Sequence, residues 1–159
     1  MEDSMPDWGP DYEGIFQNNY FYGGNLQGII QKLDYFKSLS VGMLYLSPIS
    51  RSYTYHHYDV GDQTEIDPFI GDWQDFWKLC LEAHKRNILI IVDLVFNHMS
   101  GNSVAFQKAL HGDATYRNWF EWDASNNPIY WYGFKDMPQG NKLYKEYQDY
   151  ACKAAKKYV

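Results

Sequence analysis

The chain has 159 residues, enough for one domain of ordinary size, and 45% of them are hydrophobic, which suffices for a buried core. Its formal net charge of -6 leaves no basic surface for phosphates, so a nucleic-acid partner is not expected. The N-terminus is acidic where a secretory signal would be basic and then apolar, and no stretch is apolar for long enough to cross a membrane. We expect a cytoplasmic protein with no membrane partner, or an extracellular parent if a signal was removed.

Cysteine and aromatic content narrow the chemistry further. Cys80 and Cys152 lie far apart and have no Cys or His neighbours at metal spacing, so we expect free buried thiols in a reducing compartment. Aromatic residues make up 19% of the chain, and such rings suit sugars, whose C–H faces stack on them. Aromatic-rich cores and protein interfaces are as common, so composition alone does not choose between them.

The first half of the chain shows a helix and then a strand. Residues 1–22 have no sustained period and carry several Pro and Gly residues, which indicates a loop. From Asn25 to Leu39, apolar residues recur at three- and four-residue steps and predict a helix with one face on a core. The apolar run 41–46, closed by a Ser-Pro pair, predicts a strand buried on both faces, and a long loop rich in Tyr and His follows.

The second half repeats this order and then becomes irregular. Asp72 and Asp75 precede an apolar stripe and predict a helix start, and residues 88–96 form the strongest strand pattern. Helix, strand, helix, strand in this order predicts an α/β fold with a parallel sheet. Residues 99–140 lack a clean period and predict an irregular excursion with its own aromatic cluster. Helical spacing returns from residue 143 onward.

The end of the strongest strand carries a motif. Residues 93–98 are Asp-Leu-Val-Phe-Asn-His, which resembles the first signature of the α-amylase family (glycoside hydrolase family 13). Residues 21–30, 45–49 and 57–62 also fall in that family's order and spacing. Further segments resemble the inserted B domain of neopullulanase- and cyclomaltodextrinase-type members: residues 116–120, 131–134 and 137–138. The resemblance covers nearly the whole chain.

The resemblance implies a fold and a division of the chain. It implies part of a (β/α)8 TIM barrel with an inserted irregular B domain, covering roughly strands 2 and 3 of the barrel. Residues 1–98 would form the N-terminal part of the barrel, 99–140 the B-domain-like insertion and 141–159 a barrel helix. The active site of such a barrel lies where strands end and loops begin, at the C-terminal face.

Three residues are implied to contact substrate. Tyr58 matches the ring that stacks under the sugar at the cleavage site, and His98 matches the imidazole that hydrogen-bonds that sugar's hydroxyls. Asp59 matches a residue that grips a chain end in some relatives, although a solvated or loop-capping Asp is an equal alternative. Without the resemblance, Tyr58 would be interpreted as surface packing and His98 as structural.

Two further residues are implied to support the site. Asp93 lies within an apolar strand pattern, where an unpaired carboxylate is costly, so it needs a partner. In the family this partner is an arginine from the next strand, which the chain does not include. Asn97 matches a calcium ligand of many α-amylases, which makes calcium the candidate cofactor, although neopullulanase-type members often hold calcium elsewhere. Gln63 replaces an aromatic residue that is usual in the family.

The catalytic carboxylates are expected to be missing. A retaining glycosidase needs two carboxyl groups about 5 Å apart, and the family draws them from later strands. The nucleophile normally stands two residues after an arginine, and here those positions hold Tyr53, Ile88 and Trp119. No His directly precedes an Asp, as the third carboxylate would require. We therefore assign no catalytic residue and expect an inactive fragment of a parent that hydrolyses α-glucosidic bonds of malto-oligosaccharides, cyclodextrins or related α-glucans.

Other interpretations remain open from the sequence. One alternative is a sugar-binding or interaction protein with an amylase-like fold and no chemistry, although the intact Tyr58 and His98 argue against it. Another is a stand-alone α/β domain with an incidental resemblance, which would need a closed core from these elements alone. Two strands do not close an eight-stranded barrel, so their edges and inward-facing side chains would be exposed. We therefore also expect homodimerisation, swapping or aggregation.

Overall fold

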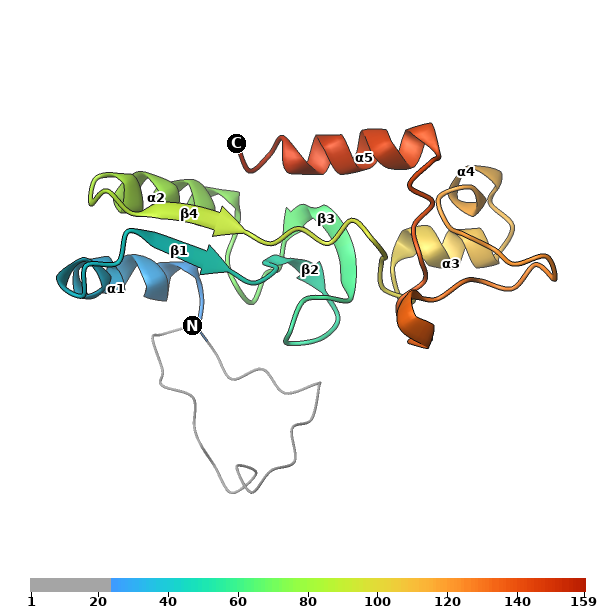
Figure 1. Cartoon of the computed structure of the whole chain (residues 1–159), viewed down its shortest axis with the longest axis horizontal. Coiled ribbons are helices and arrows are strands. Elements are labelled where there is room, and N and C mark those ends of the chain that lie inside the picture. Colours follow the sequence, from blue (N-terminus) through green and yellow to red (C-terminus); the bar gives the residue numbers. More distant parts are fainter. Residues whose placement is uncertain (1–23) are drawn as a thin grey trace, which may run out of the picture.

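The computed structural model describes residues 24–159, and the loop predicted for residues 1–22 lies outside the described residues. Helices α1 (Leu26–Ser38) and α2 (Trp73–His84) lie at one end of the longest axis (Figure 1). Strands β1 (Met43–Leu46) and β4 (Leu89–Val92) lie beside them. Short helices occupy the other end, and α5 (Lys145–Ala155) runs back from that end toward the first. The chain thus forms two groups of elements joined by the segment after β4 and by α5.

Both long helices begin where their capping residues predict. The Asn25 side chain accepts a hydrogen bond of 2.8 Å from the Gly28 amide at the start of α1. Asp72 and Asp75 form a complete capping box at the start of α2, each side chain accepting from the other residue's backbone amide. Leu26 and Leu33 of α1 pack with the buried face of α2, so both predicted helices and their core-facing stripes are confirmed.

Strands β1 (Met43–Leu46) and β4 (Leu89–Val92) pair in parallel, which confirms the predicted α/β arrangement. Met43 lies opposite Leu89, and Leu46 lies opposite Val92. The predicted burial of both faces is wrong within the described residues. One face packs against the core formed with α1 and α2, and it carries Leu44, Leu46, Ile90 and Val92. The opposite face is exposed and carries Met43, Tyr45, Leu89 and Ile91.

The long loop after β1 contains a second two-stranded sheet, here called the small sheet, that the sequence pattern did not predict. Strand β2 (Ser50–Ser52) pairs antiparallel with β3 (Val60–Ile66), with irregular register at both steps. These strands are short and rich in polar residues, so they lack the apolar alternation by which strands are predicted. The sheet folds the segment between them, residues 53–59, into a compact turn that carries Tyr58 and Asp59.

Residues 99–140 form the predicted irregular excursion. It contains α3 (Val104–Leu110), α4 (Ala114–Arg117), a 3₁₀ turn η2 (Trp131–Gly133) and isolated β-bridges. Phe106, Phe120 and Tyr147 form the centre of its core, surrounded by further rings, so the predicted aromatic cluster is confirmed. Tyr147 comes from α5, whereas Tyr158 after α5 packs on the first core. The domain boundaries at residues 98 and 140 stay predictions.

Two simpler expectations are tested by the described residues. Cys80 and Cys152 are free thiols, but Cys152 is exposed and Cys80 is only half-buried, so their predicted burial is wrong. Cys152 lies on the outer side of α5, where a helix position faces solvent regardless of its apolar character. Across residues 24–159, none of the helices combines the length and the apolar character that a membrane span requires.

Gly140 gives a test of the junction between the insertion and α5. A Cβ at this position would overlap the ring of Tyr147, which is buried and donates a hydrogen bond of 3.0 Å to the Phe96 carbonyl. We expect Gly140→Ala to lower the free energy of unfolding by about 1 to 3 kcal/mol, the usual cost of overpacking a rigid site. Urea denaturation followed by circular dichroism measures this difference.

Gly42→Ala is the matched control, because no neighbouring atom among the described residues lies within 4 Å of a Cβ at Gly42. Its stability should match that of the wild type. Equal stability of the Gly140 and Gly42 variants would contradict the packing described for Tyr147.

Candidate functional site

The carboxylate of Asp93 lies where β4 ends and joins three segments. Its backbone amide donates to the Leu46 carbonyl at 3.0 Å, which continues the parallel ladder by one residue. Its Oδ2 accepts a hydrogen bond of 2.7 Å from the Tyr45 hydroxyl and one of 3.0 Å from the Tyr58 hydroxyl. Asp93 is half-buried, so the partner expected for this carboxylate is supplied by two phenols within the described residues.

The hydrogen bonds to Asp93 raise the pKa of both phenols. The hydrogen bond to Asp93, followed by partial burial and the negative charge, raises the pKa of Tyr45 to about 12. The same causes, again led by the hydrogen bond to Asp93, raise the pKa of Tyr58. Both rings therefore stay neutral hydrogen-bond donors at physiological pH. A neutral ring with its hydroxyl fixed leaves its face available to a ligand.

Tyr45 was not predicted as a site residue, because its position within an apolar run indicated only a buried strand. The available signal was the strand period: Tyr45 has the same parity as Met43, and this parity faces away from the helices. A tyrosine near the carboxyl end of such a strand places its hydroxyl at the site. Tyr45 remains 63% exposed.

Tyr58 is fixed through its backbone as well as its hydroxyl. Its carbonyl lies 2.9 Å from Nε2 of His98, and its amide donates to Nδ1 of His56 at 3.0 Å. A carbonyl only accepts, so Nε2 of His98 carries the proton. Burial lowers the pKa of His98, which keeps the imidazole neutral. The Tyr58 side chain remains 40% exposed.

His98 therefore lies beside Tyr58 and contacts its backbone carbonyl. The residue is only 3% exposed, and its Nδ1 has no hydrogen-bonding partner among residues 24–159. The ring of Trp131 stacks on the imidazole, with centroids 4.9 Å apart and planes at 26°. The predicted direct contact between His98 and sugar hydroxyls stays a prediction.

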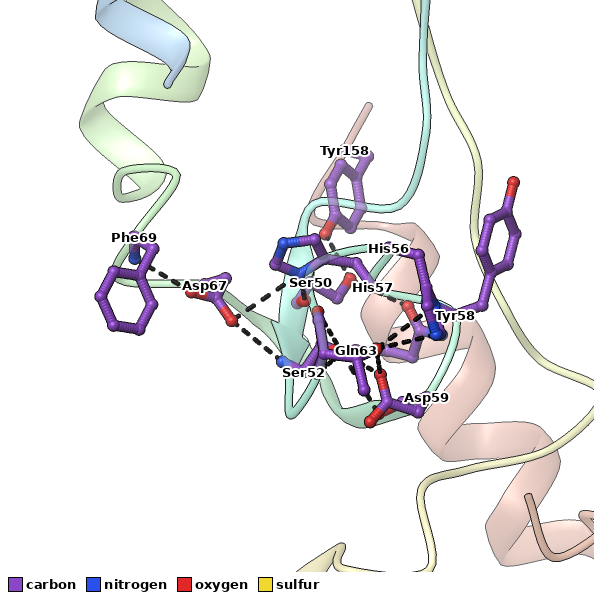
Figure 2. Close-up of polar contacts among 11 residues, drawn as sticks. Ser50, Ser52, His56, His57, Tyr58, Asp59, Gln63, Asp67, Phe69 and Tyr158 are labelled. Carbon is purple, nitrogen blue, oxygen red and sulfur yellow. Dashed lines mark hydrogen bonds and ion pairs between the residues drawn. The ribbon is translucent and has the colours of Figure 1, made fainter. Parts of the chain in front are cut away.

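Asp59 belongs to the same turn as Tyr58, residues 53–59, here called the Tyr58 loop, and it is buried. Its carboxylate accepts hydrogen bonds from the hydroxyls of Ser52 and Thr54 (Figure 2). Only 5% of the residue is exposed. These contacts favour the loop-capping alternative that the sequence left open, because the carboxylate is already paired within its own loop. A direct contact of Asp59 with a sugar stays a prediction.

Two further buried polar residues, Gln63 and Asp67, hold the small sheet in place, and Figure 2 labels both. Gln63 accepts from the Ser50 hydroxyl at 2.9 Å and donates to the Val95 carbonyl, which ties β3 to the segment after β4. Asp67 accepts from the amide of Ser52 at 3.1 Å and from that of Phe69 at 2.9 Å. Gln63, where the family usually has an aromatic residue, is thus an internal support here.

Asn97, the predicted calcium ligand, directly precedes His98, and its side-chain oxygen already has a hydrogen-bond donor. Its side-chain oxygen accepts a hydrogen bond of 2.8 Å from the ammonium of Lys142. A divalent cation on the same oxygen would be repelled by that ammonium, and calcium takes six to eight oxygen ligands. Among residues 24–159, no group of three or more His, Cys, Asp or Glu side chains is placed to hold a metal. The calcium role of Asn97 stays a prediction, and this contact argues against it.

A hollow of ≈ 540 Å³ opens between the start of α1 and the segment after β1. Its lining includes Tyr45 but not Tyr58, Asp93 or His98. We therefore place the candidate site at the strand ends, where the fixed aromatic ring and the carboxylate converge, and not in this hollow.

Solved structures identify the architecture to which the parallel strand pair belongs. The chain matches a cyclomaltodextrinase with a TM-score of 0.78 and 32% sequence identity, over 89% of this chain and 26% of that chain. It is a mixed α/β portion of a (β/α)8 barrel, as predicted, and Tyr45, Tyr58 and Asp93 lie at or beyond the carboxyl ends of its strands.

Sequence comparison then gives the family. Residues 3–156 match the family described as Alpha amylase, catalytic domain, so the chain belongs to the α-amylase family. It is 43% identical over 138 residues to Alpha-amylase 2 of Dictyoglomus thermophilum, covering 86% of this chain and 24% of that protein. It is 42% identical over 106 residues to Neopullulanase 2 of Thermoactinomyces vulgaris, covering 65% and 18%. The chain thus spans about a quarter of the length of the first of these two relatives and less than a fifth of the second.

Asp93→Asn tests the shared carboxylate. The substitution keeps an oxygen at this position but removes the charge, so the pKa of Tyr45 should fall from about 12 toward its ordinary value of about 10, and the pKa of Tyr58 should fall with it. A pH titration of the tyrosine Cζ signals by ¹³C NMR measures both. Tyr150, whose pKa is raised mainly by burial, should keep its raised pKa and serves as the internal control. An unchanged Tyr45 titration would contradict the hydrogen bond to Asp93.

Chelation tests the cation at Asn97. Because the Lys142 ammonium already occupies the Asn97 oxygen, EDTA should leave the melting temperature of the chain unchanged, and added calcium should not raise it. Differential scanning calorimetry measures this. A lower melting temperature in EDTA that is restored by calcium, but not by magnesium, would instead support a resident calcium ion.

Proposed function

We propose that the chain supplies the sugar-binding side of the active site in a glycoside hydrolase that acts on α-glucosidic bonds of malto-oligosaccharides, cyclodextrins or related α-glucans. The observation that carries this proposal is the fixation of Tyr58. Its hydroxyl is held by Asp93, its carbonyl by His98, and its ring remains exposed at a strand end of a barrel-type fold. Membership of the α-amylase family supports the substrate class.

The arrangement suits a glucose ring on physical grounds. A sugar presents C–H groups on its faces and hydroxyls around its edge, so it binds a flat ring flanked by polar groups. Tyr58 offers such a ring, and the Asp93 carboxylate beside it offers an acceptor for a hydroxyl. Because both contacts of Tyr58 are made before a sugar arrives, little side-chain entropy is lost on binding. In this proposal Tyr58 stacks on the sugar, Asp93 orients Tyr58 and accepts from a sugar hydroxyl, and His98 orients Tyr58.

Bond cleavage requires catalytic carboxyl groups. The 159 residues do not contain these groups in the sequence patterns that the family uses. Hydrolysis with retention needs a carboxylate nucleophile and a carboxylic acid about 5 Å apart. Neither an Arg-x-Asp sequence nor a His-Asp pair occurs in the chain. We therefore propose that the chain alone binds α-glucan and cleaves no bond.

Two further parts of the proposal concern assembly and location. The exposed face of the β1–β4 sheet carries Met43, Tyr45, Leu89 and Ile91, and such an apolar face supports association with a second copy of the chain. The free thiols of Cys80 and Cys152 support a reducing, cytoplasmic location.

Calorimetric titration with maltotriose and β-cyclodextrin tests the proposed function. The wild-type chain should bind both sugars, and Tyr58→Ala should weaken binding about tenfold or more because the stacking ring is lost. Tyr58→Phe should lose less, because it keeps the ring and loses only the hydroxyl contact with Asp93. Tyr35→Ala, which removes another exposed tyrosine on the outer side of α1, should bind like the wild type.

A reducing-sugar assay on the same samples should detect no glucose or maltose release. Release by the purified wild-type chain would contradict the proposed division between binding and cleavage. Equal affinities of the Tyr58→Ala and Tyr35→Ala variants would contradict the role of Tyr58.

A further inference from the structure

Gln63 is a buried polar side chain at the centre of a set of hydrogen bonds that has no part in the function proposed above. This set, here called the Gln63 network, consists of the Tyr158, Ser50 and Gln63 side chains, which Figure 2 labels, and of the Val95 carbonyl. Only 1% of Gln63 is exposed, and Ser50 is fully buried. Burying an amide is unfavourable unless its polar atoms are hydrogen-bonded, so these bonds decide how the Gln63 side chain lies.

The hydrogen bonds of the Gln63 network run in one direction. The Val95 carbonyl only accepts, so Nε2 of Gln63 donates to it and Oε1 faces Ser50. The Ser50 hydroxyl has one proton and donates it to Oε1 at 2.9 Å, so it accepts from the Tyr158 hydroxyl, 3.0 Å away. A reversed amide would place Oε1 against the Val95 oxygen. The network therefore fixes the Gln63 amide in the donating orientation.

The Val95 carbonyl belongs to the segment that carries both supports of Tyr58. Asp93 lies two residues before Val95, and His98 lies three residues after it. Asp93 accepts from the Tyr58 hydroxyl at 3.0 Å, and His98 donates to the Tyr58 carbonyl at 2.9 Å. Strand β4 ends at Val92, so individual contacts and not a regular ladder set the backbone path of this segment. A shift of the Val95 carbonyl would therefore displace Asp93 and His98 relative to each other.

The other contact of Gln63 also anchors it to a fixed element. Its backbone amide donates to the Tyr150 hydroxyl of α5 at 2.7 Å. Burial raises the pKa of Tyr150 and that of Tyr158, so both phenols stay neutral. Gln63 is thus held at its backbone by α5 and at its side chain by Ser50, and its Nε2 is directed at Val95.

We propose that Gln63 is a positioning residue for sugar binding, because its donation to the Val95 carbonyl sets where Asp93 and His98 stand and thereby where they hold the Tyr58 ring. This inference rests on the proposed function. The family usually has an aromatic residue at this position. The amide therefore gives this chain its own way of fixing the segment, through a directed hydrogen bond and not through ring packing.

Gln63→Met tests the donation. Methionine has a similar length but no donor for the Val95 carbonyl, so calorimetric titration should show an affinity for maltotriose lowered about threefold to tenfold. The pKa of Tyr58, which the hydrogen bond to Asp93 raises, should fall toward its ordinary value of about 10 in a ¹³C NMR titration without sugar. Ser103→Ala is the matched control, because it removes a buried hydroxyl that accepts from the Phe106 amide at 3.2 Å and lies outside the Gln63 network. It should lower stability and leave both readouts unchanged.

Gln63→Glu tests the direction of the bond through its pH dependence. A protonated carboxyl donates to a carbonyl as the amide does, whereas a carboxylate only accepts. The variant should therefore bind maltotriose like the wild type at low pH, and its relative affinity should fall as pH rises through the pKa of the introduced carboxyl. That pKa lies above its ordinary value of about 4.3, because burial disfavours the charged form.

The ratio of the two affinities at each pH isolates this carboxyl. The other titratable groups near the network are Tyr150, Tyr158 and His57, whose Nδ1 lies 3.3 Å from the Ser50 carbonyl. All three are present in both proteins, so their contributions cancel in the ratio.

The outcomes separate this inference from the proposed function. A wild-type chain that binds no maltotriose overturns both. If the wild type binds, and a folded Gln63→Met keeps its affinity and its Tyr58 titration, the positioning role alone is overturned. An equal loss of affinity in Ser103→Ala overturns it as well, because lower stability then explains the effect. An affinity ratio of Gln63→Glu to wild type that is constant with pH overturns the donation to Val95.

Discussion

The candidate site depends on one carboxylate at the end of a strand. Asp93 fixes Tyr45 from the neighbouring strand and Tyr58 from a loop, both through the same oxygen. Hydrogen bonds to a charged acceptor are stronger than neutral ones, and a half-buried carboxylate without donors would be costly. The pairing therefore sets the position of both rings with little freedom. If Asp93 were displaced, the Tyr58 loop would keep only its backbone supports.

The backbone supports of the Tyr58 loop come from residues that are distant in sequence. Helix α5 contacts the segments that carry these residues. Tyr150 donates to an Asp62 oxygen at 3.2 Å and accepts from the Gln63 amide at 2.7 Å, while Tyr147 donates to the carbonyl of Phe96. Burial raises the pKa of both tyrosines, so they remain neutral. One helix thereby joins the small sheet below Tyr58 to the segment that runs from Asp93 to His98. The geometry of the site is a property of the whole described chain and not of its loop alone.

The sequence predicted the three longest helices and the two parallel strands, because their signals are local. Helical periods and the Asp72–Asp75 capping pair depend on neighbouring residues, and the structure confirms them. The resemblance carried in part by residues 93–98 implied that Asp93, His98 and the loop with Tyr58 lie at strand ends of a barrel, and in the structure Asp93 and His98 both contact Tyr58. Sequence reasoning did not find β2 and β3, since their pairing is made by polar residues, nor the role of Tyr45, since its face of β1 is decided by which side the helices cover. The Trp131 stack on His98 joins residues 33 positions apart and leaves no pattern in either segment.

The pairing of β1 with β4 explains why polar and apolar side chains lie next to each other at the site. Along its exposed face, Met43 and Leu89 lie opposite each other, and Tyr45 and Ile91 form the next pair. The face is thus apolar until Tyr45, whose hydroxyl introduces the first polar group, and Asp93 follows two positions after Ile91 on the same parity. The strand period therefore directs the carboxylate to the exposed face, where the Tyr58 loop meets it. The even step of four positions from Leu89 to Asp93 is the constraint, because a shift by one position would turn Asp93 toward the apolar helices.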